Sequence, residues 1–417
     1  MLLLGASALS LDRSAAQRLA SPRLDALLAR HGWIKLTLGG SVREATVTVN
    51  GQATIIADTA SSDCATNAVE LIYSNGAIEA RVPGKAPFLA QSLMVAGAGN
   101  TFAYKGRQYR GRVQAVAGGG GITVINEVMI DDWLKGVLPA EIGSDSPLEA
   151  LKAQAIAARS EAIFRLSHPP HKSEGYDFCT GEHCQAYKGI SEETAAIRQA
   201  CDATLGYVLV AQDDVVNAVY HNVCGGATAA AEDVWDGDPE PGLRPVFDTL
   251  RGGSPNLQSE AAAGAFLEAE GRDCFCYPGN PGYAEYAKKY FRWTRTLDAG
   301  AAGRAAGVGT LTDIRVIERR PSGRVRRLQV VGTSGQKVIE KELPIRRMFD
   351  LWSGLFVIKV ENAGGRLNSV TFIGGGNGHG VGLCQHGARE IARRGGTFDQ
   401  ILGHYYPGAT LRKVYRP

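Results

Sequence analysis

Glycine is the feature that most constrains how this chain folds, because 52 of its 417 residues are glycine. That share is about 12%, against about 7% in average proteins. Many of the glycines gather in short clusters, for example at 118–121 and 374–376. Glycine adopts backbone conformations that other residues avoid, and it lets another segment approach the backbone closely. The clusters therefore predict many tight turns and close backbone approaches, and not a low-complexity linker.

The pattern of apolar residues predicts an α+β fold with a β-rich mixed architecture and a few helices. The reactive segments described below predict, in addition, an active-site cleft formed by loops between lobes. Residues 1–33 are predicted to be an N-terminal segment, whose apolar start resembles a clipped signal peptide or linker. Residues 34–126 alternate apolar and polar side chains in short stretches, as half-buried strands do. Residues 127–417 are predicted to form the core that carries these reactive segments, with an irregular excursion at about 238–304 that is rich in proline and glycine.

Local signals predict individual elements. Strands are expected at 34–38, 45–49, 113–116, 311–316, 326–331 and 355–360, and a helix is expected at 388–402. Asn50-Gly51 is a hairpin-type turn signal. The segment from Ser146 to Glu149 has the form of a capping box with proline at the first helical position, and it predicts a helix that runs to about Leu166.

Two basic residues fall within the apolar arc of this helix. Lys152 lies near the edge of the arc, where its ammonium group can reach water. Arg159 lies near the middle, where a guanidinium group requires a carboxylate or several carbonyls as partners. Two interpretations of Arg159 stay open at this point, a structural ion pair and a role in an active site.

Four segments are dense in reactive side chains and glycines. They are Leu134–Glu141, Cys179–Tyr187, Tyr220–Thr228 and Gly378–Ala388. Glycine beside histidine and cysteine lets the backbone come close to a ligand. The four segments together predict a cleft assembled from several loops.

These segments resemble the SpoIID/LytB family. The resemblance is carried by Gly136–Glu141 followed by Pro147–Arg159, by His221–Thr228, and by the C-terminal blocks Gly378–Gly382, Gln385–Ala388 and His404–Gly408. The motifs occur in the family's order, and the similarity extends from about residue 34 to the end of the chain. Motifs in this order over that span are far more specific than a single glycine pattern.

The resemblance implies a lytic transglycosylase that cleaves the bond between N-acetylmuramate and N-acetylglucosamine in peptidoglycan and leaves 1,6-anhydro ends. The family's catalytic glutamate corresponds to Glu141, and the arginine of its helix corresponds to Arg159. Without the resemblance, Glu141 would be interpreted as an exposed loop glutamate just ahead of a helix. The substrate-binding residues expected from the other motifs are Tyr187, His221, His379 and Gln385.

The resemblance also suggests a metal, because some family members bind zinc through a segment equivalent to Cys179, His183 and Cys184. A tetrahedral zinc site needs a fourth ligand, and the candidates are His171, Cys224 and Cys384. The alternative is a disulfide, for example between Cys184 and Cys224, in an exported protein. A structural zinc is thus the expected cofactor, and no organic cofactor is expected.

The expected partners are peptidoglycan glycan strands and a cell-wall amidase, which places the protein in the extracytoplasmic cell envelope. A net charge of +3 and scattered basic residues argue against nucleic acid. Two other functions stay open. One is a non-catalytic wall-binding protein that modifies an amidase, as proposed for the LytB branch. The other is a zinc hydrolase that uses the Cys-His-Cys segment as its catalytic centre.

Overall fold

The computed structural model describes residues 21–57, 60–64 and 66–415, so the predicted signal segment at the start of the chain lies outside the described residues. Helices alternate with mainly antiparallel sheets, which confirms the α+β class. The chain divides into two compact units. Unit 1 contains the described residues up to Val208 with 213–215 and 412–415, and unit 2 contains 209–212 and 216–411. The boundaries predicted at 33 and 126 stay predictions.

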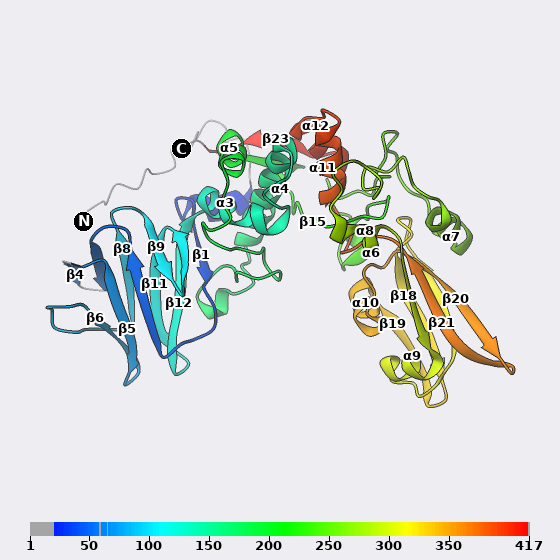
Figure 1. Cartoon of the computed structure of the whole chain (residues 1–417), viewed down its shortest axis with the longest axis horizontal. Coiled ribbons are helices and arrows are strands. Elements are labelled where there is room, and N and C mark those ends of the chain that lie inside the picture. Colours follow the sequence, from blue (N-terminus) through cyan, green and yellow to red (C-terminus); the bar gives the residue numbers. More distant parts are fainter. Residues whose placement is uncertain (1–20, 58–59, 65, 416–417) are drawn as a thin grey trace. The chain divides into compact units, whose positions relative to one another are not determined.

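Unit 1 contains a sandwich of two six-stranded antiparallel sheets (Figure 1). The first sheet has the order β1-β12-β11-β8-β3-β4, and the second has the order β10-β9-β2-β5-β6-β7. The first sheet comprises β1 (Trp33–Thr37), β3 (Ala53–Ala57), β4 (Ala60–Asp63), β8 (Ser92–Gly97), β11 (Arg112–Gly118) and β12 (Gly121–Met129). The second comprises β2 (Glu44–Val49), β5 (Ala68–Ser74), β6 (Ala77–Arg81), β7 (Phe88–Ala90), β9 (Thr101–Tyr104) and β10 (Arg107–Arg110).

Alternation of side chains explains why these segments form a sandwich. In β2, the side chains of Ala45, Val47 and Val49 are buried, whereas the residues between them are exposed or partly exposed. The predicted strands at 34–38, 45–49 and 113–116 are confirmed as β1, β2 and β11. The hairpin predicted at Asn50-Gly51 is wrong, because the turn joins β2 to β3 and these strands belong to different sheets.

The helices of unit 1 follow the sandwich in the sequence. They are α2 (Pro22–Leu28), α3 (Ile130–Glu141), α4 (Leu148–Leu166), the short 3-10 helix η1 (Lys172–Glu174) and α5 (Ala195–Ala203). The long helix predicted after Ser146 is confirmed as α4, which packs against α2, α3 and α5. The predicted capping box is wrong. Pro147 occupies the N-cap position, and the Ser146 hydroxyl instead donates a hydrogen bond to the Ile142 carbonyl at 2.8 Å.

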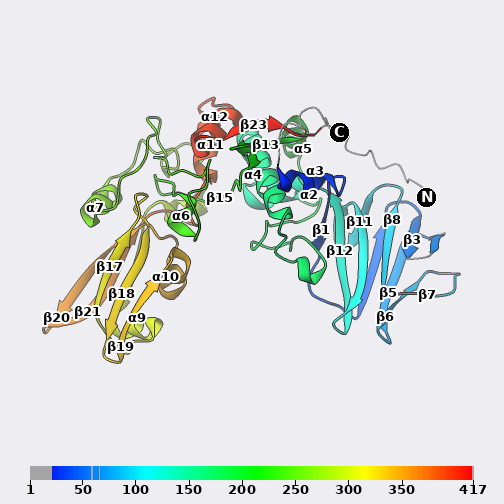
Figure 2. The same ribbon diagram turned by 180° about the vertical axis from the view of Figure 1, so that it is seen from behind.

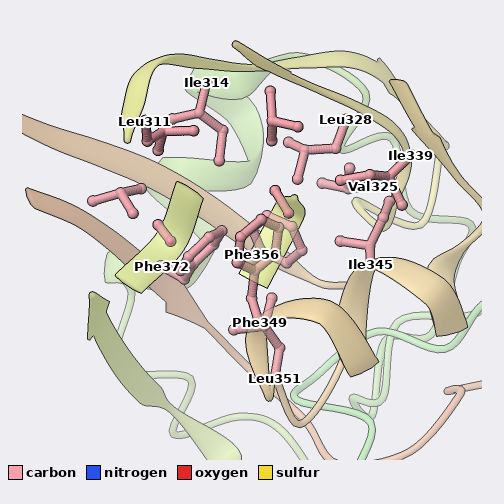
Figure 3. Packing of buried hydrophobic residues seen from close by; sticks show 14 of the residues in the cluster. Leu311, Ile314, Val325, Leu328, Ile339, Ile345, Phe349, Leu351, Phe356 and Phe372 are labelled. Carbon is pink, nitrogen blue, oxygen red and sulfur yellow. The ribbon is translucent and has the colours of Figure 1, made fainter. Parts of the chain in front are cut away.

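Unit 2 contains two three-stranded antiparallel sheets and a short parallel pair (Figure 2). The strands are β16 (Trp293–Asp298), β17 (Leu311–Arg319), β18 (Val325–Gly332), β19 (Gly335–Glu340), β20 (Phe356–Ala363) and β21 (Arg366–Gly374), with β15 (Tyr220–His221) paired to β22 (Leu383–Cys384). Figure 3 shows the apolar core between the two sheets and helices α9 and α10, where residues such as Leu328, Phe356 and Phe372 are fully buried. Strands β13 (Tyr207–Ala211), β14 (Asp214–Val215) and β23 (Thr410–Lys413) lie where the chain passes between the units.

The helices of unit 2 correct two expectations. They are α6 (Ala231–Val234), α7 (Glu260–Glu268), the 3-10 helix η2 (Glu285–Ala287), α8 (Lys288–Phe291), α9 (Ala299–Ala306), α10 (Glu342–Phe349), α11 (Gln385–Arg393) and α12 (Phe398–Tyr405). The segment 238–304 therefore holds more regular structure than its composition predicted. The single helix predicted at 388–402 is wrong, because a turn with Gly395 at a φ of +88° separates α11 from α12. Across the described parts of both units, no helix is long and apolar enough to cross a membrane.

Glycine at position 136 lets a loop pack directly on α3. A β-carbon at this position would lie 2.5 Å from the ring of Tyr187 and 2.6 Å from the carbonyl oxygen of Gly189. We expect Gly136→Ala to lower the free energy of unfolding by about 1–2 kcal/mol, because overpacking against backbone exceeds the gain in helix propensity. Urea unfolding followed by circular dichroism measures the change.

Gly264→Ala in α7 is the matched control, because a β-carbon there meets no atom within 4 Å. The urea midpoint of Gly264→Ala should stay the same as that of the wild type or rise. Equal midpoints for the two variants would contradict the packing argument.

Candidate functional site

Glu141 is the last residue of α3, which begins directly after strand β12. Its prediction as a loop residue is therefore wrong, since Pro139 is accommodated inside the last turn of the helix. The side chain is partly exposed. Its Oε1 accepts a hydrogen bond from the backbone N–H of Ala186 at 2.7 Å, and its Oε2 has no hydrogen-bond partner among the described residues. One carboxylate oxygen is thus held by the protein while the other is available to a substrate.

The surroundings of Glu141 favour its protonated form. Burial raises the pKa of the Glu141 carboxyl, the Ala186 N–H partly offsets this increase, and the charge of Glu182 adds to it. Desolvation disfavours the charged form of a carboxylic acid. A raised pKa is the property that a glutamate needs to act as a general acid near neutral pH.

A second carboxyl group, Glu161 on α4, lies in the same region and was missed by the sequence analysis. It is buried, with 8% of its surface exposed, and it accepts hydrogen bonds from Gln185 Nε2 at 3.1 Å and from Arg165 at 3.3 Å. Burial raises the pKa of Glu161 to about 7, and the charge of Glu141 contributes to the increase. No local signal reveals this residue, because its surroundings come from a loop 24 residues further along the chain.

Gln185 and Ala186 connect the two carboxyl groups. The Gln185 side chain donates to Glu161 and to the Ala158 carbonyl of α4, while the next backbone N–H donates to Glu141. The conformation of this two-residue segment therefore sets the surroundings of both acids. Tyr187, the next residue, is 4% exposed and its hydroxyl donates to Asn126 at 3.2 Å. The tyrosine expected to bind substrate thus packs in the interior of unit 1.

Arg159 forms the ion pair that its position in the apolar arc required. Its guanidinium is fully buried and donates to Asp131 Oδ1 from Nη2 at 2.6 Å and from Nε at 2.9 Å. Nη1 donates to the Tyr207 carbonyl at 3.1 Å, and the Tyr415 hydroxyl donates to the other carboxylate oxygen of Asp131 at 2.7 Å. The pair ties the first turn of α3 to α4, whereas Glu141 lies at the opposite end of α3. Lys152, in contrast, pairs with Glu149 at the partly exposed edge of α4.

Four potential metal ligands come together just before Gln185. The ligand atoms of His171, Cys179, His183 and Cys184 all lie within 4.8 Å of one another. His183 Nδ1 is 3.8 Å from the sulfur of Cys179 and 3.5 Å from that of Cys184. Of the three candidates for a fourth ligand, His171 lies in this group, whereas Cys224 and Cys384 lie together in unit 2.

The chemistry of this group fits a soft divalent cation. His171 Nδ1 is 2.7 Å from Glu174 Oε1, and its buried Nε2 has no hydrogen-bond partner among the described residues. Pairing of one ring nitrogen with a carboxylate is the arrangement that orients metal-binding histidines. Burial opposes ionisation of Cys179, but hydrogen bonds from the Gly181 backbone, Cys184 and His183 lower the pKa of this thiol to about 6. All eight cysteines are free thiols.

The remaining predicted substrate-binding residues lie in unit 2. His221 in β15 is buried, and its ring packs edge-on against that of His379 with centroids 5.6 Å apart. The exposed ring of Trp235 lies 5.0 Å from His379 and adds an aromatic surface that the motifs did not indicate. Gln385 begins α11 and is 8% exposed. The expectation that these residues and Glu141 line one cleft stays a prediction.

Comparison with known protein families matches two segments of the chain. Residues 118–210 match the family model described as stage II sporulation protein (SpoIID), and residues 229–382 match a domain of unknown function, DUF8618. The first match includes Glu141, Arg159 and the four potential metal ligands before Gln185. The second includes His379 and Trp235 but neither His221 nor Gln385.

Curated relatives share low sequence identity with this chain, but the similarity extends over most of its length. An uncharacterized protein of Brachyspira hyodysenteriae is 27% identical over 74% of both chains. Stage II sporulation protein D of Bacillus subtilis is 26% identical over 70% of this chain and 76% of its own length. The amidase enhancer of the same species is 25% identical over 67% of this chain. The matched region covers only 40% of the amidase enhancer's own length. These matches confirm the resemblance to the SpoIID/LytB family that the motifs carry.

Removal of Arg159 should destabilise unit 1 strongly. We expect Arg159→Ala to lower the free energy of unfolding by about 3–5 kcal/mol, because the substitution leaves the buried Asp131 carboxylate without its cation. Lys152→Ala on the same helix is the control and should cost about 0–1 kcal/mol, since its ion pair is partly exposed. Urea unfolding measures both, and similar losses would contradict a structural role for the Arg159 pair.

Glu161 should make stability depend on pH. Because its folded pKa of about 7 exceeds the ordinary value of 4.5, its contribution is fully present below about pH 4.5 and is lost as pH rises through 7. The total change is about 3 kcal/mol. Glu161→Gln should remove that part of the decrease when unfolding is measured by urea from pH 4.5 to 8. Glu149 is a partly exposed acid on the same helix, and Glu149→Gln should leave the pH dependence of the free energy of unfolding unchanged. A Glu161→Gln variant with the same pH dependence as the wild type would contradict the raised pKa of Glu161.

Proposed function

We propose that this chain is a peptidoglycan lytic transglycosylase that cleaves the β-1,4 bond between N-acetylmuramate and N-acetylglucosamine, with Glu141 as general acid and then base. Resemblance to the SpoIID/LytB family supports a role at the cell wall. The observation that carries the specific proposal is the carboxyl group of Glu141, whose pKa is raised by burial and which presents one unpaired oxygen at the end of a helix.

One carboxyl group is enough for both proton transfers in this reaction. Glu141 donates its proton to the glycosidic oxygen, and the bond from that oxygen to C1 of the muramate breaks. The C6 hydroxyl of the same sugar then bonds to C1 and gives its proton to the Glu141 carboxylate, which closes the 1,6-anhydro ring and restores the acid. Hydrolases normally need a second carboxylate to activate water, whereas here the nucleophile is part of the substrate.

Protein groups around Glu141 have separate roles in this proposal. The Ala186 N–H holds Oε1 and stabilises the carboxylate that forms after the first proton transfer. When Glu161 is ionised, its charge disfavours the Glu141 carboxylate that forms during the reaction. The protonated form of Glu161 therefore favours turnover. The Asp131–Arg159 pair fixes the helix that carries the acid.

We also propose that His171, Cys179, His183 and Cys184 hold a structural zinc ion. Two thiolates and two imidazoles form a complete tetrahedral ligand set, which leaves no position for a catalytic water. When bound, the ion would restrain the loop that ends immediately before Gln185 and Ala186. This ligand set argues against the zinc hydrolase alternative.

The likeness to the amidase enhancer supports a second candidate, a non-catalytic wall-binding partner of an amidase. Both candidates place the protein in the extracytoplasmic envelope with glycan strands as its ligand. They differ in the products, since the second releases no sugar fragments by itself.

Glu141→Gln tests the proposal. Purified sacculi and peptide-stripped glycan strands are incubated with each protein, and the products are separated by liquid chromatography and identified by mass spectrometry. The wild type should release 1,6-anhydro-muramyl ends, and Glu141→Gln should reduce the rate by at least about 10²–10⁴-fold, the usual contribution of a general acid, with unchanged circular dichroism.

Glu182→Gln is the matched control, because Glu182 influences Glu141 only through its charge and should retain most of the activity. Reducing ends in place of anhydro ends would favour hydrolysis. The absence of products from the wild type, together with stimulation of an added amidase, would support the second candidate.

A further inference from the structure

A second group of potential metal ligands lies in unit 2, and it includes the two fourth-ligand candidates, Cys224 and Cys384, that do not join the unit 1 group. It consists of Cys224 after β15, Asp248 and Cys276 in two loops, and Cys384 at the junction of β22 and α11. Each of the four residues has an exposed fraction of 0%. Their ligand atoms all lie within 4.8 Å of one another. We propose that these three cysteines and Asp248 bind a thiophilic divalent cation, such as Zn²⁺, in a closed structural site.

The distances suit a single metal ion. With metal–sulfur bonds of about 2.3 Å and a metal–oxygen bond of about 2.1 Å, the ligand atoms of a tetrahedral site lie roughly 3.6–3.8 Å apart. Cys224 Sγ lies 3.3 Å from Cys276 Sγ and 3.2 Å from Asp248 Oδ2. A shift of a few tenths of an ångström therefore brings these atoms to the separation that a tetrahedral ion requires.

Hydrogen bonds around the group resemble those around metal-bound thiolates. The Cys224 N–H donates to Cys384 Sγ at 3.2 Å, and the Gly226 N–H donates to Cys224 Sγ at 3.3 Å. These donors stabilise negative charge on sulfur, which is the form that binds a metal. Ordinary buried cysteines act as small apolar residues, and a group of three beside a carboxylate does not fit that role.

Asp248 supplies the strongest argument for a cation. Its carboxylate accepts hydrogen bonds from the Tyr405 hydroxyl at 2.5 Å and from the Cys276 N–H at 3.0 Å. Its only ion-pair partner among the described residues is His404, at 3.7 Å. A buried carboxylate requires a compensating charge, and the position next to the three sulfurs is where a divalent cation supplies it.

Four protein ligands that are fully buried describe a structural site, because a catalytic metal keeps a position open for substrate or water. The ligands are separated by up to 160 residues, so one ion restrains four segments of unit 2. Cys384 belongs to β22 and pairs with His221 of β15, and Cys224 follows β15 closely in the sequence. The ion would thereby fix the strand pair on which this histidine depends.

Metal content tests the proposal without reference to activity. The full chain is purified without a metal-affinity column, and zinc per chain is measured by inductively coupled plasma mass spectrometry. A Cys179→Ser/Cys184→Ser variant removes two of the four potential ligands of the unit 1 group. We expect this unit 1 variant to retain one equivalent of zinc, bound in unit 2. Adding Cys276→Ser to this variant should reduce the zinc content per chain to near zero.

Cys274→Ser, in the same loop but outside the group, is the matched control and should keep the metal. Asp248→Asn, a substitution of equal size, should weaken zinc binding and serves where Cys276→Ser does not fold. Cobalt(II) added to the apoprotein of the unit 1 variant should give the intense thiolate charge-transfer and tetrahedral bands.

Two results would overturn the proposal. One is a unit 1 variant that is folded, contains no metal and gives no thiolate–cobalt bands. The other is a disulfide between Cys224 and Cys276, detected by peptide mapping after alkylation without reductant. Loss of glycan cleavage in Glu141→Gln bears on neither result, so the two proposals can fail independently.

Discussion

The buried ion pair between Asp131 and Arg159 joins α3 to α4, and the placement of the acid depends on it. Asp131 lies in the first turn of α3 and Glu141 in the last, about 15 Å apart along a rigid helix. Fixing the first turn therefore fixes the direction in which the carboxyl group of Glu141 emerges. The Tyr415 hydroxyl occupies the second oxygen of Asp131, so the end of the chain contributes to the same anchor.

At the other end of α3, two opposing effects set the state of Glu141. Burial favours the neutral acid, whereas the Ala186 N–H favours the carboxylate. In the proposed reaction, where Glu141 serves as acid and then as base, this balance stabilises neither form enough to stop the cycle. Gln185, beside Ala186, acts on Glu161 in the same way, so one short segment controls both carboxyl groups.

Sequence patterns predicted the elements whose signals are local. Strands β1, β2 and β11 and helix α4 have clear periodicity. Arg159 was expected to have a carboxylate or several carbonyls as partners because a charge in an apolar arc requires them. The capping box failed because the Ser146 hydroxyl found a nearer carbonyl at Ile142. Glu161 could not be predicted from its helix, since its pKa depends on a loop that folds back onto α4.

The two groups of thiols illustrate the same limit. The ligands in unit 1 lie between residues 171 and 184, where the family resemblance suggested a metal, whereas those in unit 2 come from four distant segments with no spacing motif. Glycine makes the second group possible. A β-carbon at Gly387 would lie 2.8 Å from the Asp248 carboxylate, so only glycine lets α11 approach it. Because cross-links that close long loops restrict the unfolded chain most, a metal in unit 2 would contribute more to folding than one in the short loop of unit 1.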